Sequence, residues 1–352
     1  MTRARDLANV ADDVSTGTVV TTASPSLGRR RLNMNGSMIV AQRGTSTSVG
    51  TGSEGYSPDR WRLGTAATTA ADIKQSTTVP SGSGFANSLH VDVTTADSTL
   101  ASGDAVLLQF KFEGQDLQGI KKGTSGAESL TLSFWVRSSK TGTHVVELYD
   151  ADNTRHINKA CTVNTADTWE FKTIEFSGDT SGVLDNDNGE SLVLNFWLGA
   201  GSTYSSGSLS DSWASVTNAN RAAGQVNVFD STSNNFYITG VQLEVGSVAT
   251  PFEHRSYGEE LALCQRYFEY VNYEIGAVAG SSSGRGTRFP YRMAVDKRSS
   301  PTVTINSTST NRCSVPTAVT TYQSSVTLRT TNSNTDNDDY TASGSFTADA
   351  EL

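Results

Sequence analysis

The sequence predicts an all-β protein: an antiparallel jelly-roll β-sandwich with a short N-terminal helix and a smaller β-rich C-terminal domain. The composition is polar and rich in glycine, with 36% hydrophobic residues, a mean hydropathy of −0.35 and 31 glycines. Short runs of alternating apolar and polar residues recur between clusters of Gly, Asn, Asp and Ser. No ten-residue helical pattern separates these runs, which favours an antiparallel sandwich over a parallel α/β sheet.

The strands of the sandwich are predicted from residues that alternate between a buried and a wet face. They are Ser37–Ala41, Arg60–Leu63, Ser88–Thr94, Ala105–Phe112, Leu130–Arg137, His144–Tyr149, Trp169–Phe176, Ser191–Leu198 and Phe236–Val245. Three inward rows follow from the alternation: Val106, Leu108, Phe110 and Phe112; Leu130, Leu132, Phe134 and Val136; and Leu192, Leu194, Phe196 and Leu198. Trp135 and Trp197 then lie on the opposite faces of their strands, where we expect loops to cover them.

A second unit is predicted after Tyr257, so that the expected domains are 1–30, 31–255 and 256–352. It begins with a short helix, Glu259–Tyr267. The strands Tyr270–Ala277, Arg288–Ala294, Pro301–Asn306, Ala318–Thr321, Ser325–Thr330 and Asp339–Ala348 follow. Because this unit is small and has few large apolar side chains, we expect its core to be marginal and to be completed by neighbouring copies.

The N-terminal residues have the pattern of a short amphipathic helix. Leu7, Val10 and Val14 recur near helical spacing, and Arg3 and Arg5 lie beside them. An isolated helix of this length is marginal in water, so its apolar stripe needs a partner. We interpret residues Arg3 to Val14 as an attachment segment. The alternative is a helix that folds back on its own sheet, or a frayed terminus.

The net charge of −9 and the pI near 5.0 argue against nucleic acid as a partner, because phosphate binding depends on clustered Lys and Arg. The run Arg29–Arg31 is the exception, and we interpret it as a solvated loop or an anchor to an acidic protein surface. No apolar run approaches the length of a membrane span, and no signal-peptide core follows Met1, so neither membrane insertion nor export is expected. Cys161, Cys264 and Cys313 are far apart and are expected to be reduced.

No enzymatic site can be assembled from the sequence. The four histidines His90, His144, His156 and His254 cannot be placed beside a nucleophile, and no Gly-x-Ser-x-Gly motif occurs at a strand-to-helix turn. Carboxylates are too common for a glycosidase pair to be inferred. We therefore expect no catalysis and no cofactor. Asp185 and Asp187, near Gly189, are candidate calcium ligands, although such strings are more often plain turns.

Sugar binding is the more plausible ligand interaction. Aromatic rings stack on the apolar faces of sugars, while Asn, Asp and Gln bind the hydroxyls. Trp169, Tyr204 and Trp213 are the candidate glycan contacts, and the last two lie in the long Gly/Ser-rich segment 199–220. The alternative for Trp213 is an indole that packs under its own loop.

Two motifs resemble a known family. Asn33–Gly44, together with Tyr56–Trp61, and the segment Gly240–Phe268 resemble the opening and the closing segments of a module in tail fibre and other minor virion proteins of tailed bacteriophages. The resemblance covers residues 33 to 273. It implies an assembly role, three-fold symmetry and a place in the virion, which is assembled in the host cytoplasm. Arg43, Asp59, Arg60 and Trp61 are interpreted as structural residues that lock the entry loop onto the sandwich.

The rear motif also contains charged residues at the predicted domain junction. Glu253, His254, Arg255 and Glu259 are expected to tie the two domains together or to form a contact between subunits. The sequence therefore favours a non-enzymatic tail fibre or related appendage that attaches to other virion proteins through its N-terminus and contributes to binding a host-surface glycan, as a homotrimer. The alternatives are a capsid-bound decoration protein and a polysaccharide-degrading fibre.

Overall fold

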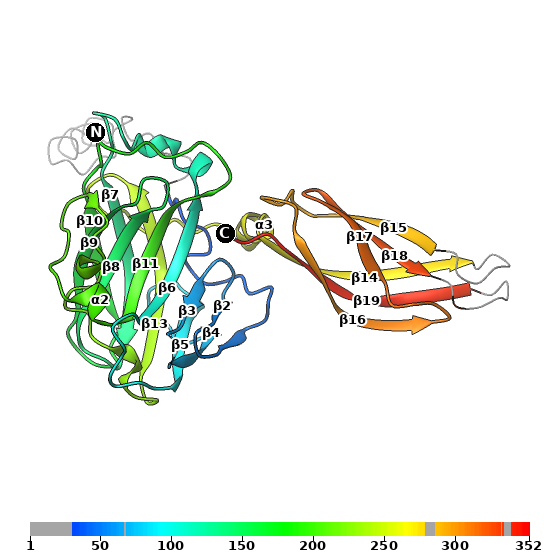
Figure 1. Ribbon diagram of the computed structural model, residues 1–352, viewed down its shortest axis with the longest axis horizontal. Helices are drawn as coiled ribbons and strands as arrows, with labels where there is room; N and C mark the ends of the chain where they lie inside the picture. The colour runs from blue at the N-terminus through cyan, green and yellow to red at the C-terminus, as the bar shows by residue number, and fades with distance from the viewer. Residues whose placement is uncertain (1–29, 67, 279–285, 332, 334–338) are drawn as a thin grey trace, which may run out of the picture.

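The computed structural model shows a large β-sandwich joined to a smaller β domain (Figure 1). It describes residues 30–352 except 67, 279–285, 332 and 334–338. The all-β prediction is confirmed. The predicted attachment residues Arg3, Arg5, Leu7, Val10 and Val14 lie outside the described residues. Within the described part of the chain, no helix has the length and apolar character needed to cross a membrane.

The sandwich consists of two antiparallel sheets. The six-stranded sheet has the order β1 (Ser46–Val49), β4 (Ala70–Ser76), β5 (Ser88–Thr95), β13 (Asn235–Val245), β7 (Leu130–Ser138) and β10 (Glu170–Phe176). The seven-stranded sheet has the order β12 (Ala214–Ser215), β9 (Arg155–Val163), β8 (Gly142–Asp150), β11 (Glu190–Ala200), β6 (Ala105–Glu113), β3 (Arg62–Gly64) and β2 (Glu54–Tyr56). Short helical turns lie in the loops: η1 (Gly114–Asp116), η2 (Gln118–Ile120), α2 (Ser202–Ser205), η3 (Asn218–Asn220) and η4 (Val228–Asp230).

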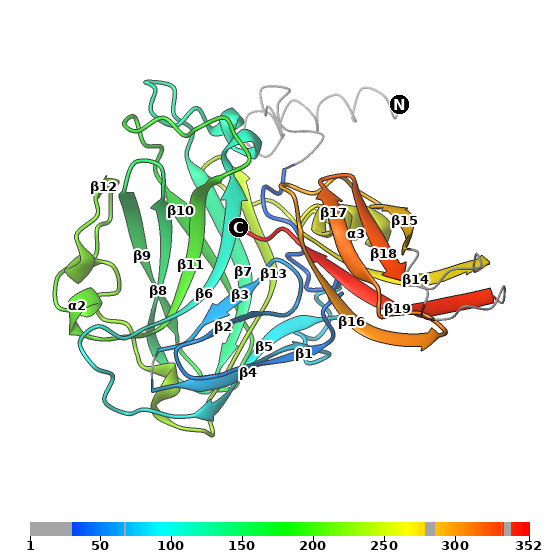
Figure 2. The same ribbon diagram turned by 45° about the vertical axis from the view of Figure 1, so that its right-hand side comes forward.

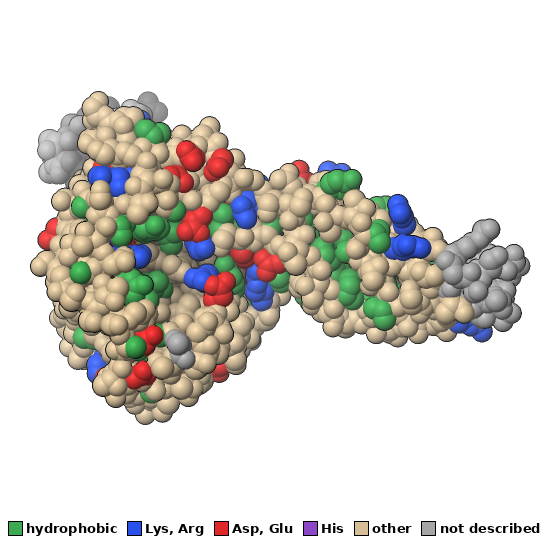
Figure 3. Space-filling model, viewed as in Figure 1, with side chains coloured by type: hydrophobic (Ala, Val, Ile, Leu, Met, Phe, Trp, Pro, Cys, Tyr) green, Lys and Arg blue, Asp and Glu red, His purple; other side chains and the backbone are tan. Residues whose placement is uncertain are grey.

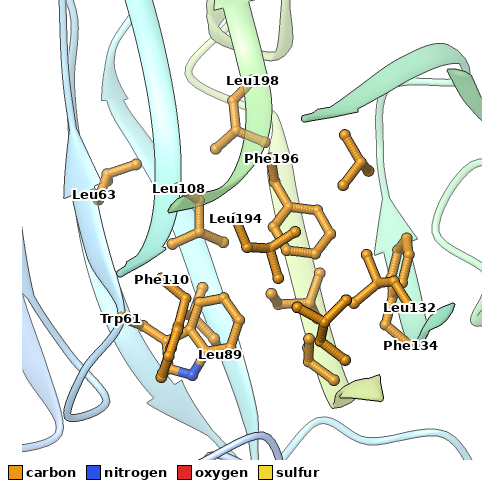
Figure 4. Packing of buried hydrophobic residues seen from close by; sticks show 14 of the residues in the cluster. Trp61, Leu63, Leu89, Leu108, Phe110, Leu132, Phe134, Leu194, Phe196 and Leu198 are labelled. Carbon is orange, nitrogen blue, oxygen red and sulfur yellow. The ribbon is translucent and has the colours of Figure 1, made fainter. Parts of the chain in front are cut away.

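The core lies between the two sheets (Figure 4). All three predicted inward rows are buried, as is Trp61. Phe134 of one sheet meets Phe196 of the other edge-on at 5.1 Å, and Trp61, just before β3, lies 5.3 Å from Phe110 of the neighbouring strand β6. Burial of these large rings adds to the apolar stabilisation that the many buried Val, Leu and Ile residues of the core supply.

The structure corrects some strand predictions. Ser37–Ala41 is not a strand, because the Asn35 side chain closes a loop by accepting from the Val40 amide and donating to the Val40 carbonyl. Strands β1, β2, β4, β9 and β12 were not predicted. The prediction at Arg60–Leu63 lies two residues early, since β3 begins at Arg62 and Arg60 has a positive φ of 73°.

The C-terminal domain begins with α3 (Tyr257–Gln265), which a capping box of Ser256 and Glu259 initiates. Two three-stranded sheets follow: β14 (Phe268–Val278), β19 (Asp339–Asp349) and β16 (Thr302–Asn311) in one, and β15 (Gly286–Arg292), β18 (Ser325–Thr331) and β17 (Thr317–Tyr322) in the other. They enclose a core that includes Ile275, Leu328 and Phe346, all with no exposed surface. This core is buried within one chain, so neighbouring copies are not needed to complete it.

The front and rear motifs lie side by side although more than two hundred residues separate them. The Asn33 side chain donates to the Val241 carbonyl and accepts from the Leu243 amide, both at 2.9 Å. A Cβ on Gly36 would lie 2.0 Å from the Val241 carbonyl oxygen, so only glycine fits there. The two motifs therefore form one structural unit.

This unit also connects the two domains. Arg31 is fully buried against Glu260 of α3, so this residue is not solvated, whereas Arg29 lies outside the described residues. Arg60 pairs with Glu351, and Arg43 lies 2.8 Å from Asp349. The ion pairs of Arg43 and Arg60 therefore join the entry loop to the end of the C-terminal domain, whereas the sequence predicted a lock onto the sandwich.

The predicted junction residues lie at this same place, although they have different roles. Glu253 accepts from the Arg31 amide at 2.9 Å, and Arg255 donates to the Arg31 carbonyl at 2.6 Å. Glu259 completes the capping box of α3. The His254 ring packs 4.9 Å from Phe252. Within one chain, these contacts hold the first described residues against the linker between the domains.

Candidate functional site

A row of hydrogen-bonded polar side chains crosses the outer face of the seven-stranded sheet. Arg62 on β3, Gln109 on β6, Asn195 on β11 and Glu147 on β8 are direct cross-strand neighbours. Arg62 donates to Gln109, Gln109 donates to Asn195 at 2.7 Å, and Asn195 donates to Glu147 at 3.0 Å. Each member fixes the orientation of the next, so this polar row, Arg62–Gln109–Asn195–Glu147, is preorganised.

Glu147, at one end of the polar row, is fully buried. Besides Asn195, it accepts hydrogen bonds from His156 at 3.1 Å, from Trp197 at 3.2 Å, and from Arg221 at 2.8 and 2.9 Å. Burial by itself would raise the pKa of Glu147, but the hydrogen bonds from His156 and Arg221 outweigh it and hold this pKa below its usual range. Glu147 is therefore a carboxylate anion within the protein.

The Glu147 anion holds a segment of chain over one end of the sheet. This covering segment, residues 201–227, contains Arg221, whose guanidinium lies 5.0 Å from the Tyr149 ring centre and 5.4 Å from that of Trp197. Tyr204, from the same segment, packs 5.4 Å from Trp197, which is 1% exposed. The covering segment and its aromatic residues thus form a wall beside the polar row.

The other end of the polar row opens into a cavity of about 410 Å³. Its lining combines Glu54, Arg62 and Thr65 with the apolar side chains of Ala105 and Leu107. Arg62 pairs with Glu54 in this lining. Farther along β6, on the other side of Gln109, Lys111 lies 2.6 Å from Glu190. Figure 3 looks onto this face and shows acidic and basic side chains gathered between the sandwich and the C-terminal domain. We call the polar row with this cavity and the wall the groove.

Ser210, His156 and Glu147 have the atomic arrangement of a hydrolase triad. The Ser210 hydroxyl lies 3.2 Å from His156 Nε2, and His156 Nδ1 lies 3.1 Å from Glu147. However, Arg221 already binds the same carboxylate through two hydrogen bonds, and His156 has no exposed surface. An imidazole without access to substrate cannot transfer a proton to it. Ser210, His156 and Glu147 therefore form a buried hydrogen-bonded chain that holds the covering segment on the sheet.

The three predicted glycan contacts lie in three different places. Tyr204 belongs to the wall of the groove. Trp213 donates to the Ser177 carbonyl at 2.8 Å and lies under the Lys122 ammonium, at an edge of the sandwich. Trp169 lies beyond the groove, edge-on to Tyr237 of the six-stranded sheet at 6.1 Å.

The outer face of the six-stranded sheet has a different character. His90 stacks on Tyr237 with ring centres 4.0 Å apart, and Trp135 lies 5.4 Å from Phe171, which is 51% exposed. Charged side chains beside them form partly exposed pairs, such as Lys74 with Asp92 at 2.7 Å. Trp135 is half-buried here, whereas Trp197 is covered as expected.

The candidate calcium ligands form ordinary loop contacts. Asp187 accepts from the Gly189 amide at 2.8 Å, and the Asp185 amide donates to Asp152 at 2.9 Å. Among the residues that the structure describes, no group of three or more His, Cys, Asp or Glu side chains is arranged to hold a metal ion. The three cysteines are buried and free.

Comparisons with known proteins find only distant structural likenesses. No protein-family model and no curated protein matches the chain. Among solved structures, the family 61 carbohydrate-binding module TmCBM61 with β-1,4-galactotriose aligns over 62% of this chain and 99% of its own, with 10% identity and a TM-score of 0.31. A family 11 carbohydrate-binding module from Clostridium thermocellum aligns over 58% of this chain and 98% of its own, with 11% identity and a TM-score of 0.29.

A viral protein is also among the similar structures. The enzymatically active domain of tailspike protein 4 from bacteriophage CBA120 aligns over 61% of this chain, with 12% identity and a TM-score of 0.29. The present chain spans 21% of the length of that domain. These likenesses are too distant to assign a ligand or a reaction.

Proposed function

We propose that this chain is a non-enzymatic structural protein of a tailed phage virion, a tail fibre or a related appendage, and that its groove binds a glycan on the host surface. The observation that carries the glycan proposal is the polar row beside an open cavity. The Arg62 guanidinium and the half-buried Gln109 amide can bind sugar hydroxyls in fixed directions, because the buried Asn195 and Glu147 hold them in place. Ala105 and Leu107 offer apolar surface to a pyranose ring. Because the row is held in place before binding, little conformational entropy is lost when a sugar binds.

The charges around the groove favour binding over catalysis. A glycosidase needs one carboxylic acid with a raised pKa and a second free carboxylate. Here Glu54 pairs with Arg62, Glu190 pairs with Lys111, and the lowered pKa of Glu147 makes it a poor proton donor. These pairings support a binding role.

The phage assignment rests on the resemblance of the front and rear motifs to virion proteins. Their packing into one unit at the domain junction supports a structural role for both. We propose that residues 1–30 attach the chain to another virion protein and that copies assemble as a homotrimer. Deletion of residues 1–14 should leave a folded protein that no longer enters particles. Normal incorporation of the truncated chain would contradict this attachment.

The glycan proposal is tested by binding. The full chain is applied to an array of bacterial surface polysaccharides, and the best oligosaccharide is titrated calorimetrically. Replacing both Arg62 and Gln109 with alanine should weaken binding by about tenfold or more, since loss of a hydrogen bond to a sugar costs on the order of 1.4 kcal/mol. Phe171→Ala on the opposite sheet is the matched control and should bind as the wild type does. Retention of no glycan, or equal binding by both variants, would refute the proposal.

A further inference from the structure

Two basic side chains flank Gln109 on the outer face of the seven-stranded sheet. Arg62 on β3 is the cross-strand neighbour of Gln109, and Lys111 lies on the same face of β6, two residues farther along that strand. β2, β3 and β6 are neighbours in the sheet, and Figure 2 shows them next to one another. The Gln109 amide therefore has a cation on either side.

In the ion pair that each cation forms, the cation lies deeper than the carboxylate. The Arg62 side chain is 20% exposed, whereas its partner Glu54 is 58% exposed. The Lys111 side chain is 19% exposed, whereas its partner Glu190 is 31% exposed. The two cations thus lie close to the sheet, and the two carboxylates lie at the rim of the groove.

The two cations are also held from within the protein. Arg62 donates to Gln109, which the polar row keeps in position. Lys111 donates to the Leu352 carbonyl at 3.0 Å, at the point where the last residues of the chain return to the sandwich (Figure 2). A partly exposed ion pair contributes little to stability, so Glu54 and Glu190 can turn away at little cost while both cations stay in place.

The Arg62 cation gains from an anion that stays close to it. Burial lowers the pKa of Arg62 below its ordinary value, although the charge of Glu190 acts in the opposite direction. A guanidinium binds a carboxylate or a phosphate through two parallel hydrogen bonds, and an ammonium binds the same groups as a point charge. Both cations therefore suit an anionic ligand.

We infer that the groove binds an acidic glycan, whose anionic groups displace Glu54 and Glu190 and pair with Arg62 and Lys111. In the free protein, the two rim carboxylates occupy the positions of the ligand's anions. The cavity beside Arg62 receives the uncharged part of the sugar. This inference rests on the proposed glycan binding and adds the class of sugar. Uronic acids and sugar phosphates both carry suitable anions, and the test separates them.

The first test compares polysaccharides on the full chain. Capsular polysaccharides that contain hexuronic acids are titrated calorimetrically, together with the same polymers after reduction of their carboxyl groups to alcohols. Reduction should weaken binding by about tenfold or more, because it removes the charge and keeps the ring hydroxyls. A phosphate-bearing teichoic acid is the third ligand, and tighter binding to it than to the hexuronates would identify phosphate as the anion.

The results that contradict the inference differ from those that contradict glycan binding. Equal binding of native and reduced polymers, or binding of neutral polysaccharides alone, would overturn the acidic class and leave glycan binding intact. Retention of no polysaccharide of either kind would refute the proposed function itself.

The second test removes a rim carboxylate. Glu54→Gln eliminates the competing anion and should bind a hexuronate polymer at least about threefold more tightly than the wild type does. Asp92→Asn is the matched control, because it removes one negative charge from a partly exposed pair on the opposite sheet and should leave the affinity unchanged. Equal gains in both variants would reveal a general effect of net charge, and no gain in Glu54→Gln would show that Glu54 does not occupy the ligand's position.

Discussion

The two outer faces of the sandwich satisfy their polar side chains in different ways. On the seven-stranded sheet, Gln109 and Asn195 bind each other and connect to a fully buried Glu147. On the six-stranded sheet, Lys74 and Asp92 form a pair in which each side chain keeps about a third of its surface exposed. The first arrangement fixes the positions of side chains, whereas the second leaves them adjustable.

This difference makes the seven-stranded sheet the better surface for specific recognition. A row held by a buried anion offers the same hydrogen-bonding pattern to every ligand, which favours specificity. Exposed pairs change partners with water and salt at little cost. We therefore expect substitutions on the seven-stranded sheet to have larger effects than equivalent substitutions on the six-stranded sheet.

The largest expected effect is at Glu147. Glu147→Ala leaves Arg221 and His156 without their partner in the interior, so the free energy of unfolding should fall by about 3–5 kcal/mol. The matched change Asp92→Ala on the other face should cost at most about 1 kcal/mol, because that pair is partly exposed. Urea denaturation of both variants measures the difference. Equal losses would remove the distinction between the two faces.

Acid should weaken the sandwich through the same residue. The pKa of Glu147 in the folded chain lies below its value in the unfolded chain, which is about 4.3. Its contribution to stability is therefore complete above that pH and is lost as the pH falls toward the folded-state pKa. Thermal unfolding between pH 6 and pH 3 should show a steeper decline for the wild type than for Glu147→Gln. Parallel curves would show that Glu147 does not titrate as inferred.

The smallest effect is expected at Ser210. If Ser210, His156 and Glu147 only hold the covering segment, Ser210→Ala should change stability by about 1 kcal/mol or less, because it removes one hydrogen bond. A fluorophosphonate probe, which labels activated serines, should leave the wild type unmodified. Labelling that depends on both Ser210 and His156 would instead identify a hydrolase.

Much of the fold follows from local patterns. β6, β7 and β11 are predicted because large apolar residues recur at every second position of each strand, and these inward residues are buried. β9 is not predicted because Lys159 interrupts the inward row of Ile157, Cys161 and Val163. β4 has one large apolar residue, Ile73, which is too little for a pattern.

The groove is much harder to predict from the sequence. Glu147 is one of 36 acidic residues, and its donors come from positions between 9 and 74 residues away. Nothing in the local sequence distinguishes it. Tyr204 could be singled out from the sequence because it lies in a long Gly/Ser-rich segment, and long loops of this kind often carry function. In the structure that segment covers one end of the sheet.

The position of β13 has a consequence for how this protein is made. This strand lies between β5 and β7 in the middle of its sheet, yet it is the last strand of the sandwich to leave the ribosome. Before β13 is made, β5 and β7 each lack a neighbour on one side, and Asn33 cannot form its hydrogen bonds with the Val241 and Leu243 backbone. Closure of the six-stranded sheet therefore requires contacts between segments far apart in the sequence, and we expect this step of folding to be slow.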